Sequence, residues 1–218
     1  MTKEQLLTII DISPILSQLT AIFPGDVPLS REIALDFDRG DNLRLSALTT
    51  TLHIGAHTDA PSHYHPHGVD IAQQSLQIYI GVAQVMRVQV GQGKRILPVD
   101  LPAKITAQRL LLHTGTFADP NQWQGDFASL SVELVEFIAD NGVILIGIDT
   151  PSIDLADDKM LQSHNAVYRR GLAVLEGIVL DDVEDGLYTL IALPLPLEGA
   201  DASPVRAVLL PQNMFSVT

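Results

Sequence analysis

Short apolar and β-branched runs, each bounded by glycine, proline, asparagine or aspartate, recur along the whole chain and are typical of short β-strands. We predict strands at residues 9–12, 32–37, 43–51, 81–90, 109–113, 142–148, 187–193 and 205–210. Only the segment 130–142 has apolar residues at clear helical spacing, and a weaker helix is expected at about 157–168, capped by Asp154 or Asp157. Many strands and few helices predict an α/β fold. We expect one compact domain, residues 1–218, with a β-rich core and few flanking helices, not a regular doubly wound sheet.

Composition limits the partners that the chain can have. Its 218 residues are 46% hydrophobic, enough to fill a core, and its formal net charge of −13 argues against nucleic acids and anionic membrane surfaces. No apolar run approaches the roughly 18–20 residues that cross a bilayer, and the first residues lack a signal-peptide pattern. We therefore expect a soluble, cytoplasmic protein. Because the chain has no cysteine, any metal must be bound through nitrogen and oxygen atoms.

The segment from His53 to Gly68 reads HIGAHTDAPSHYHPHG and holds five of the chain's seven histidines. His53, His57, Asp59 and His63 all fall at odd positions, and alternate residues of an extended chain point to the same side. A helix is not expected here, because Gly55 and Pro61 both weaken helices. The spacing therefore predicts three imidazoles and one carboxylate on the same side of an extended segment.

This segment must bend if its side chains are to share an ion. Residues 53–63 would span about 33 Å when fully extended, whereas metal ligands lie only about 2 Å from the ion. Gly55 and the corner at residues 59–61 are the expected places for the bend. Histidine and carboxylate ligands suit Zn²⁺, Mn²⁺ or Fe²⁺, and the residue types alone do not separate these ions.

His53, His57 and Asp59 form the candidate ligand set for one ion, and the Asp59 carboxylate could bridge to a second. The alternative is a solvated, histidine-rich loop that binds metal adventitiously. We favour that alternative for His65 and His67, which follow the regular run.

A binuclear site needs donors from outside this segment, and His164 and Glu176 are the candidates. Glu176 lies inside the apolar run GLAVLEGIVL, where burying an unpaired carboxylate would cost on the order of several kcal/mol. A metal ion would supply the missing partner. Taken alone, His164 would be an ordinary surface or capping histidine, and His113, at the end of an expected strand, is interpreted as structural.

The pattern HxGxHxDxPxH, which runs from His53 to His63, resembles the signature of the metal-dependent cyclase-like amidohydrolases. Within that superfamily the chain is most similar to the bacterial kynurenine formamidases (arylformamidases), and the likeness extends over nearly the whole chain. It includes DISPILSQLTAIFPGD, LIGIDTPSIDLADDK and the long stretch of residues 171–210. The histidine signature defines the superfamily, and the C-terminal stretch points to the formamidase branch.

The resemblance implies a role for each matching residue. The residues that match zinc ligands are His53, His57, Asp59, His164 and Glu176. The first three surround one ion, while Asp59 joins the last two around a second ion, with Glu176 touching both. His63 matches the catalytic acid/base. The family fold is a compact α/β domain with a β-rich core that usually forms a homodimer, and the implied cofactor is two Zn²⁺ per subunit, with Mn²⁺ as an alternative.

The chain departs from the family pattern at two positions. Ala56 stands where the family usually has threonine, and loss of that hydroxyl would remove a group that orients the ligands. Phe23 stands where formamidases typically carry tryptophan before Pro-Gly-Asp, a ring expected to line the substrate pocket. Phenylalanine keeps an aromatic face but lacks the indole N–H, so substrate affinity or identity is affected more than the chemistry. Alternatively, Phe23 is a core anchor before a turn.

The function that this resemblance implies is hydrolysis of N-formyl-L-kynurenine, a small-molecule substrate, to L-kynurenine and formate during tryptophan breakdown. A metal-bound hydroxide would attack the formyl carbon, and His63 would transfer the proton that the leaving aryl amine needs. One alternative is a related hydrolase that opens a cyclic amide such as isatin. Another is a metal-binding protein without turnover, in which His63 would have no task.

Overall fold

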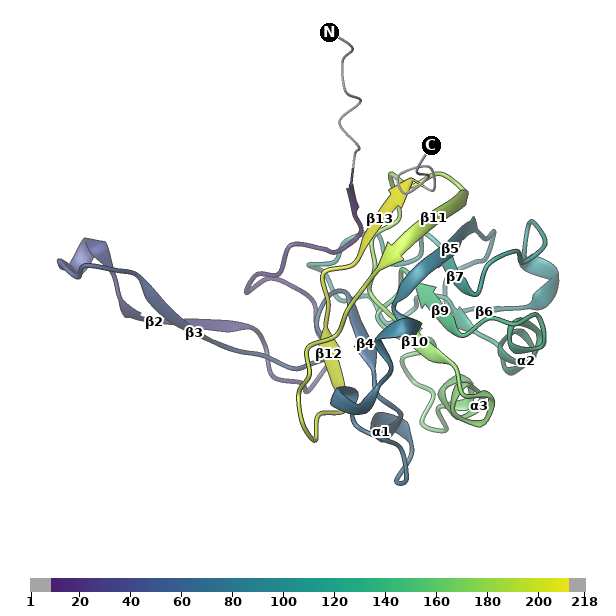
Figure 1. Ribbon diagram of the computed structural model, residues 1–218, viewed down its shortest axis with the longest axis horizontal. Helices are drawn as coiled ribbons and strands as arrows, with labels where there is room; N and C mark the ends of the chain where they lie inside the picture. Colours follow the sequence, from purple (N-terminus) through teal and green to yellow (C-terminus); the bar gives the residue numbers. More distant parts are fainter. Residues whose placement is uncertain (1–8, 212–218) are drawn as a thin grey trace, which may run out of the picture.

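The computed structural model describes residues 9–211, and its centre is a mixed seven-stranded sheet (Figure 1). In spatial order the strands are β1 (Ile10–Asp11), β13 (Val208–Pro211), β11 (Gly186–Ile191), β5 (Ile80–Arg87), β7 (Arg109–His113), β9 (Leu145–Ile148) and β10 (Ala173–Leu175). Neighbouring strands run antiparallel from β1 to β5 and parallel from β5 to β10. A sheet with both strand arrangements fits the expected α/β class and is not a regular doubly wound sheet.

Both faces of the parallel half of the sheet are buried. In β7, Leu110 and Leu112 point to one face and pack in a cluster that includes residues of α2 (Val132–Asp140) and α3 (Gln162–Arg170). Leu111 points to the opposite face, into a second apolar cluster. All of β7 is buried, as expected for a strand that is covered on both sides. The sheet thus lies between two apolar clusters, which together form the core of the domain.

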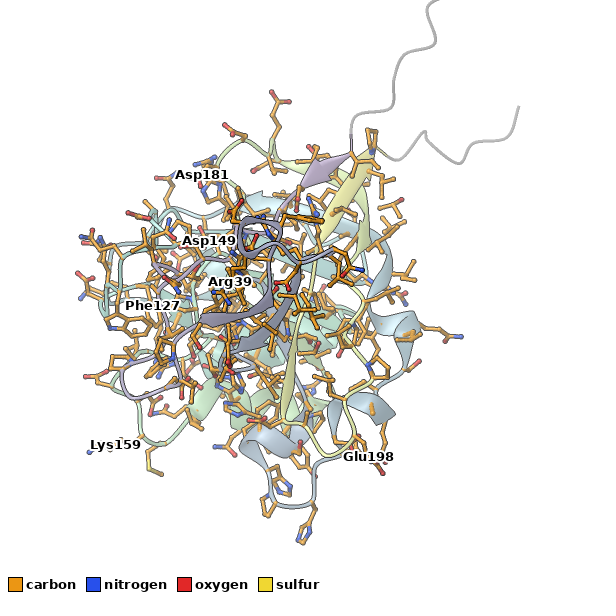
Figure 2. All side chains as sticks on the ribbon, turned by 90° about the vertical axis from the view of Figure 1, so that its left-hand side faces the viewer. Arg39, Phe127, Asp149, Lys159, Asp181 and Glu198 are labelled. Carbon is orange, nitrogen blue, oxygen red and sulfur yellow. The ribbon has the colours of Figure 1, made fainter. Side chains whose placement is uncertain are left out.

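Three pairs of short strands surround this sheet. They are β4 (His57–Asp59) with β12 (Ala202–Pro204), β6 (Arg95–Ile96) with β8 (Ser129–Leu130), and β2 (Ser30–Leu35) with β3 (Leu45–Thr49). The β2–β3 ribbon projects far from the body, as Figure 1 shows, and Figure 2 looks along it, with Arg39 close to its tip. The helix α1 (Pro61–Tyr64) follows β4 directly, and single 3-10 turns occupy Phe37–Arg39, Ile71–Gln73, Leu76–Ile78 and Pro98–Asp100.

Each strand predicted from the sequence is present, with ends shifted by a few residues, and the helix expected at 130–142 is α2. The short strands β6, β8, β10 and β12 were not predicted, because two or three residues carry too little pattern. The weaker helix begins at Gln162, later than expected, since turns occupy the preceding residues. Within residues 9–211, every helix is too short or too polar to span a bilayer.

The histidine segment was predicted to contain no helix, and this is wrong at its end. Pro61 starts α1 and occupies the first turn of that helix, where a missing N–H group leaves no helical hydrogen bond unmade. His63 therefore lies on a short helix and not on an extended segment.

Candidate metal centre

The segment that carries the histidine signature bends at the two places expected. Gly55 has a φ of 56°, a left-handed conformation that favours glycine, and it separates His53 from β4. Every residue of β4 is buried, and the chain turns at Ala60 into α1. These two bends bring His53 and His63 back toward β4, so that their ring centroids lie 4.1 Å apart.

Glu176 reaches β4 through a backbone bridge. The N–H groups of His57 and Glu176 each donate to the other residue's carbonyl oxygen, at 3.0 and 2.9 Å. The following residue, Gly177, has a φ of 64°, and a Cβ atom there would lie 2.2 Å from the carbonyl oxygen of Gly55. Only glycine permits so close an approach of the two backbones, which explains why the buried glutamate is followed by a glycine.

His164 is placed by the first turn of α3 and by Asp154. The Asp154 carboxylate accepts hydrogen bonds from the backbone N–H groups of Ser163 and His164 and lies 2.8 Å from His164 Nδ1. The N-cap of α3 is Leu161, in a left-handed conformation, so the prediction of Asp154 or Asp157 at the start of the helix is wrong. The Asp154 carboxylate accepts from the first turn although it lies eight residues before that turn begins. Arg95 donates to the same carboxylate at 2.9 Å and holds it in place.

Five predicted donors converge in two groups that share Asp59. In the first group, Asp59 Oδ1 lies 3.0 Å from His53 Nδ1 and 3.7 Å from His57 Nε2. In the second group, His164 Nε2 lies 3.4 Å from Asp59 Oδ2 and 3.6 Å from Glu176 Oε1. The other Glu176 oxygen, Oε2, lies 3.2 Å from His57 Nε2, so this carboxylate faces both groups.

These residues fit a divalent metal ion. His57 Nε2 and both carboxylate oxygens of Asp59 are buried without a hydrogen-bond partner, a costly state for polar atoms that an ion would relieve. Two donors bound tetrahedrally at roughly 2.0–2.1 Å from one ion are about 3.3–3.4 Å apart, within the range of separations seen here. All donors are nitrogen or carboxylate oxygen, which zinc, manganese and iron accept.

Each histidine of the two groups has its second ring nitrogen beside an oxygen acceptor. His57 Nδ1 lies 2.9 Å from the carbonyl oxygen of Gly55, and His164 Nδ1 lies beside Asp154 as described above. His53 Nε2 lies 3.2 Å from Asp201 Oδ2. Such partners fix the ring orientation and the tautomer of metal-binding histidines, leaving the nitrogen that faces the carboxylates free to bind.

Burial and charge act in opposite directions on these groups. Burial would lower the pKa of His164, but the neighbouring carboxylates of Asp154, Asp59 and Glu176 raise that pKa well above the usual value. Burial would raise the pKa of Asp59, but the adjacent rings of His164 and His53 lower it well below the usual value. In the absence of metal, the centre is therefore a network of histidines and ionised carboxylates that stabilise one another.

The donors lie in a pocket of about 450 Å³ whose other walls are largely apolar. His63, on the helix α1 that follows β4, also lines this pocket. Phe23 lines the pocket too and contacts Trp123 edge to face, with the ring centroids 4.7 Å apart. Its 37% exposure means that Phe23 is not a core anchor. Ala56, in contrast, is buried in an apolar cluster of the core.

The remaining histidines lie elsewhere. His65 stacks on Tyr168 with the ring centroids 3.7 Å apart, and His67 is exposed. His113, interpreted as structural, is buried at the end of β7, 3.8 Å from Asp149 Oδ2. None of these three rings lines the pocket that holds the donors.

Sequence reasoning missed the partners that orient the site. Asp154 was expected only as a helix cap, Asp201 was assigned no role, and Trp123 was not connected with Phe23. The signal for Asp201 was weak, since it stands in an unremarkable GADASP segment far along the chain. Its connection to the histidines exists only through the pairing of β4 with β12.

The fold is similar to that of several solved structures. A solved structure described as a potential metal-dependent hydrolase with cyclase activity has a TM-score of 0.82 and 21% identity, covering 94% of this chain and 98% of that one. A predicted metal-dependent hydrolase from Bacillus stearothermophilus has a TM-score of 0.79 and 22% identity, covering 94% and 99%. Isatin hydrolase A from Labrenzia aggregata, bound to benzyl benzoate, has a TM-score of 0.79 and 18% identity, covering 94% of both chains.

These likenesses confirm the predicted fold, a single compact α/β domain with many strands and few helices. The model of the Cyclase family, described as "Putative cyclase", matches residues 10–155, which is more than half of the chain and includes the whole histidine signature. The chain therefore belongs to the Cyclase family.

Proposed function

We propose that this protein is a metal-dependent hydrolase that cleaves an amide bond attached to an aromatic ring. The observation that carries the proposal is the pair of donor groups sharing Asp59 in a pocket of about 450 Å³. The pocket is large enough for a bicyclic or substituted aromatic compound, and Phe23 and Phe117 supply aromatic surface beside the donors. Family membership supports the reaction class.

The chain's own residues divide the work of such a reaction. The two donor groups would hold Zn²⁺, which when bound polarises a carbonyl and lowers the pKa of a bound water from about 15.7 to near 7. His63 is the group that moves protons, because it lines the pocket beside His53 and is 33% exposed at its side chain. Cleavage of the C–N bond leaves an aryl amine nitrogen that must gain a proton, and a histidine supplies it near neutral pH.

The first substrate we propose is N-formyl-L-kynurenine, which would yield L-kynurenine and formate. Support comes from the resemblance of the signature and of residues 171–210 to kynurenine formamidases. The aromatic ring of this substrate suits the wall formed by Phe23 and Phe117. The reaction would belong to tryptophan breakdown.

A second candidate, a cyclic amide such as isatin, is favoured by the charges of the pocket. Within residues 9–211, the pocket is lined by several aspartates and by no lysine or arginine. Arg169 and Arg170 pair with residues of α2 on the surface, and Arg206 pairs with Asp11. The α-carboxylate of formylkynurenine would thus meet no lysine or arginine side chain among the described residues, whereas isatin carries no carboxylate. The likeness in fold to an isatin hydrolase adds support.

The test is a steady-state assay of chelator-treated protein before and after Zn²⁺ is restored, with each substrate in turn. We expect metal-restored turnover of at least one substrate with kcat/KM above about 10⁴ M⁻¹s⁻¹, the low end for ordinary enzymes. A higher kcat/KM for isatin would replace the formamidase assignment with the cyclic amide. Stoichiometric metal binding without hydrolysis of any aryl formamide or cyclic amide would reject the proposal in favour of a non-catalytic metal-binding protein.

A further inference from the structure

One carboxylate oxygen lies between the candidate ligand His53 and the candidate acid/base His63. Asp201 Oδ2 is 3.2 Å from His53 Nε2 and 3.3 Å from His63 Nδ1. The three residues form a group of their own, with ligand atoms within 4.8 Å of one another. Asp201 thus contacts both residues without belonging to either group that shares Asp59.

The fold holds Asp201 in this place through the backbone. β12 pairs antiparallel with β4 so that Ala202 lies opposite Asp59. One residue further out, the N–H group of Ala60 donates to the carbonyl oxygen of Asp201 at 2.8 Å. The residue joining β4 to α1 is therefore tied to Asp201, and α1 carries His63. The Asp201–His63 contact follows from sheet register although 138 positions separate the two residues.

The ionisation of Asp201 determines which nitrogen of His63 carries the proton. An ionised carboxylate only accepts hydrogen bonds, so a neutral His63 beside Asp201 must carry its proton on Nδ1. Its Nε2 atom then has a free lone pair and can take up a proton within the pocket that His63 lines. Without an acceptor at Nδ1, the imidazole would be free to adopt the opposite tautomer, with Nε2 already protonated.

Asp201 Oδ2 also fixes the tautomer of His53, but with the proton on the other ring nitrogen, Nε2. When Asp201 accepts the hydrogen on His53 Nε2, the lone pair of this ring stays on Nδ1, the atom that lies 3.0 Å from Asp59 Oδ1. A metal ion can bind only a ring nitrogen with a free lone pair. One acceptor therefore orients His53 toward the Asp59 carboxylate and His63 toward the pocket.

We propose that Asp201 is a positioning residue whose carboxylate fixes the tautomers of both His53 and His63, linking the metal centre to the group that transfers the proton. The inference rests on the proposed function for the catalytic part of this role. The tautomers themselves are properties of the protein, and they can be measured without any substrate.

The decisive measurement is the tautomer of His63 in zinc-loaded, ¹⁵N-histidine-labelled full-length protein, by long-range ¹H–¹⁵N correlation at about pH 8, above the usual histidine pKa of roughly 6.5. The His63→Gln variant identifies the signals by their loss. We expect the Nδ1–H tautomer in the parent and a shift toward Nε2–H in Asp201→Ala. An unchanged His63 tautomer in Asp201→Ala would overturn the inference.

Kinetics and metal content supply the second readout. We expect Asp201→Ala to lose about 10- to 100-fold in kcat, as for other outer partners of metal sites, with KM nearly unchanged and partial recovery in Asp201→Glu. The matched control is Glu198→Ala, which removes an exposed carboxylate from the same loop (Figure 2). A whole ion lost from Asp201→Ala would make Asp201 a ligand and overturn its positioning role.

The two failures are distinguishable. If neither amide is hydrolysed but the tautomer of His63 shifts in Asp201→Ala, the proposed function fails and Asp201 keeps its positioning role. If the amide is hydrolysed equally well by Asp201→Ala, with unchanged tautomers, the function stands and this inference fails.

Discussion

His57 and Glu176 are joined twice, once through their backbones and once through their side chains. Their backbone groups exchange hydrogen bonds of 3.0 and 2.9 Å, and His57 Nε2 lies 3.2 Å from Glu176 Oε2. The backbone bridge does not depend on the side chain. A change confined to the carboxylate should therefore alter the metal centre and leave the local fold in place.

We expect Glu176→Gln to lose metal affinity by more than the roughly 10- to 100-fold typical of losing an outer partner, because Glu176 faces both donor groups. Metal content after dialysis against a weak chelator measures the loss, and circular dichroism checks the fold. Glu184→Gln, at an exposed position, is the control. Equal metal content in the two variants would remove Glu176 from the ligand set.

His63→Gln should separate proton transfer from metal binding. Because His63 lies outside the groups that share Asp59, we expect full metal content but a decrease of about 10²- to 10⁴-fold in kcat, the usual contribution of a general acid/base. His67→Gln, which removes an exposed histidine from the following loop, should retain activity. Normal turnover by the metal-loaded His63 variant would exclude this residue from the chemistry.

Gly177→Ala should destabilise the protein more than Gly142→Ala. Both glycines have positive φ angles, 64° and 80°, so each substitution carries a backbone penalty of roughly 1–2 kcal/mol. Only at Gly177 would the new Cβ also collide with the carbonyl oxygen of Gly55, since the space around Gly142 is open. Thermal unfolding, at about 2–4 °C per kcal/mol for a chain of this size, measures the difference. Equal decreases in Tm would show that the two backbones can move apart without cost.

Metal uptake by the metal-free protein should release protons at pH 7. Burial would lower the pKa of His53, but the neighbouring carboxylates of Asp59, Asp201 and Glu176 outweigh it and raise the pKa to about 9. An ion binds only the deprotonated ring, so it must displace this proton, and the apparent affinity should rise with pH up to about 9. Calorimetry in buffers of different ionisation enthalpy measures the release. Buffer-independent heats at pH 7 would contradict this expectation.

The same raised pKa should make the metal-free protein less stable as the pH rises, whereas the metal affinity should increase. A folded-state pKa above the unfolded value of 6.5 contributes stability that is fully present below pH 6.5 and is lost as the pH rises through about 9. Because of His53, metal-free protein should therefore have a lower Tm at pH 9 than at pH 6.5. Zinc-loaded protein should not show that decrease.

The sequence predicted the part of the site that lies within one segment. His53, His57 and Asp59 stand close enough for their spacing and their two bends to be read from residue types alone. Glu176 was noticed because an acidic residue in an apolar run needs a partner. Asp201 gave no such signal, since its contacts depend on which strand lies beside β4. Pairing between distant strands is not encoded in any local pattern.

For the fold, too, the sequence predicted the elements with a local pattern and not the details that depend on distant residues. The longer strands and α2 have apolar patterns that sequence alone reveals, and these patterns gave the α/β class correctly. The late start of α3 was not predictable, because its N–H groups are satisfied by the distant Asp154 carboxylate. The local sequence does not predict α1, because proline weakens a helix interior, but Pro61 occupies the first helical turn, where proline is well tolerated.

The dispersal of the donors along the chain has a consequence for biosynthesis. Asp201 follows His63 by 138 positions, so at about 5–20 residues per second its synthesis lags by on the order of ten seconds. During that interval Asp154, His164 and Glu176 are added, but the pairing of β4 with β12 cannot form. The contacts of Asp201 with His53 and His63 therefore arise only after all five donors of the two groups have been made.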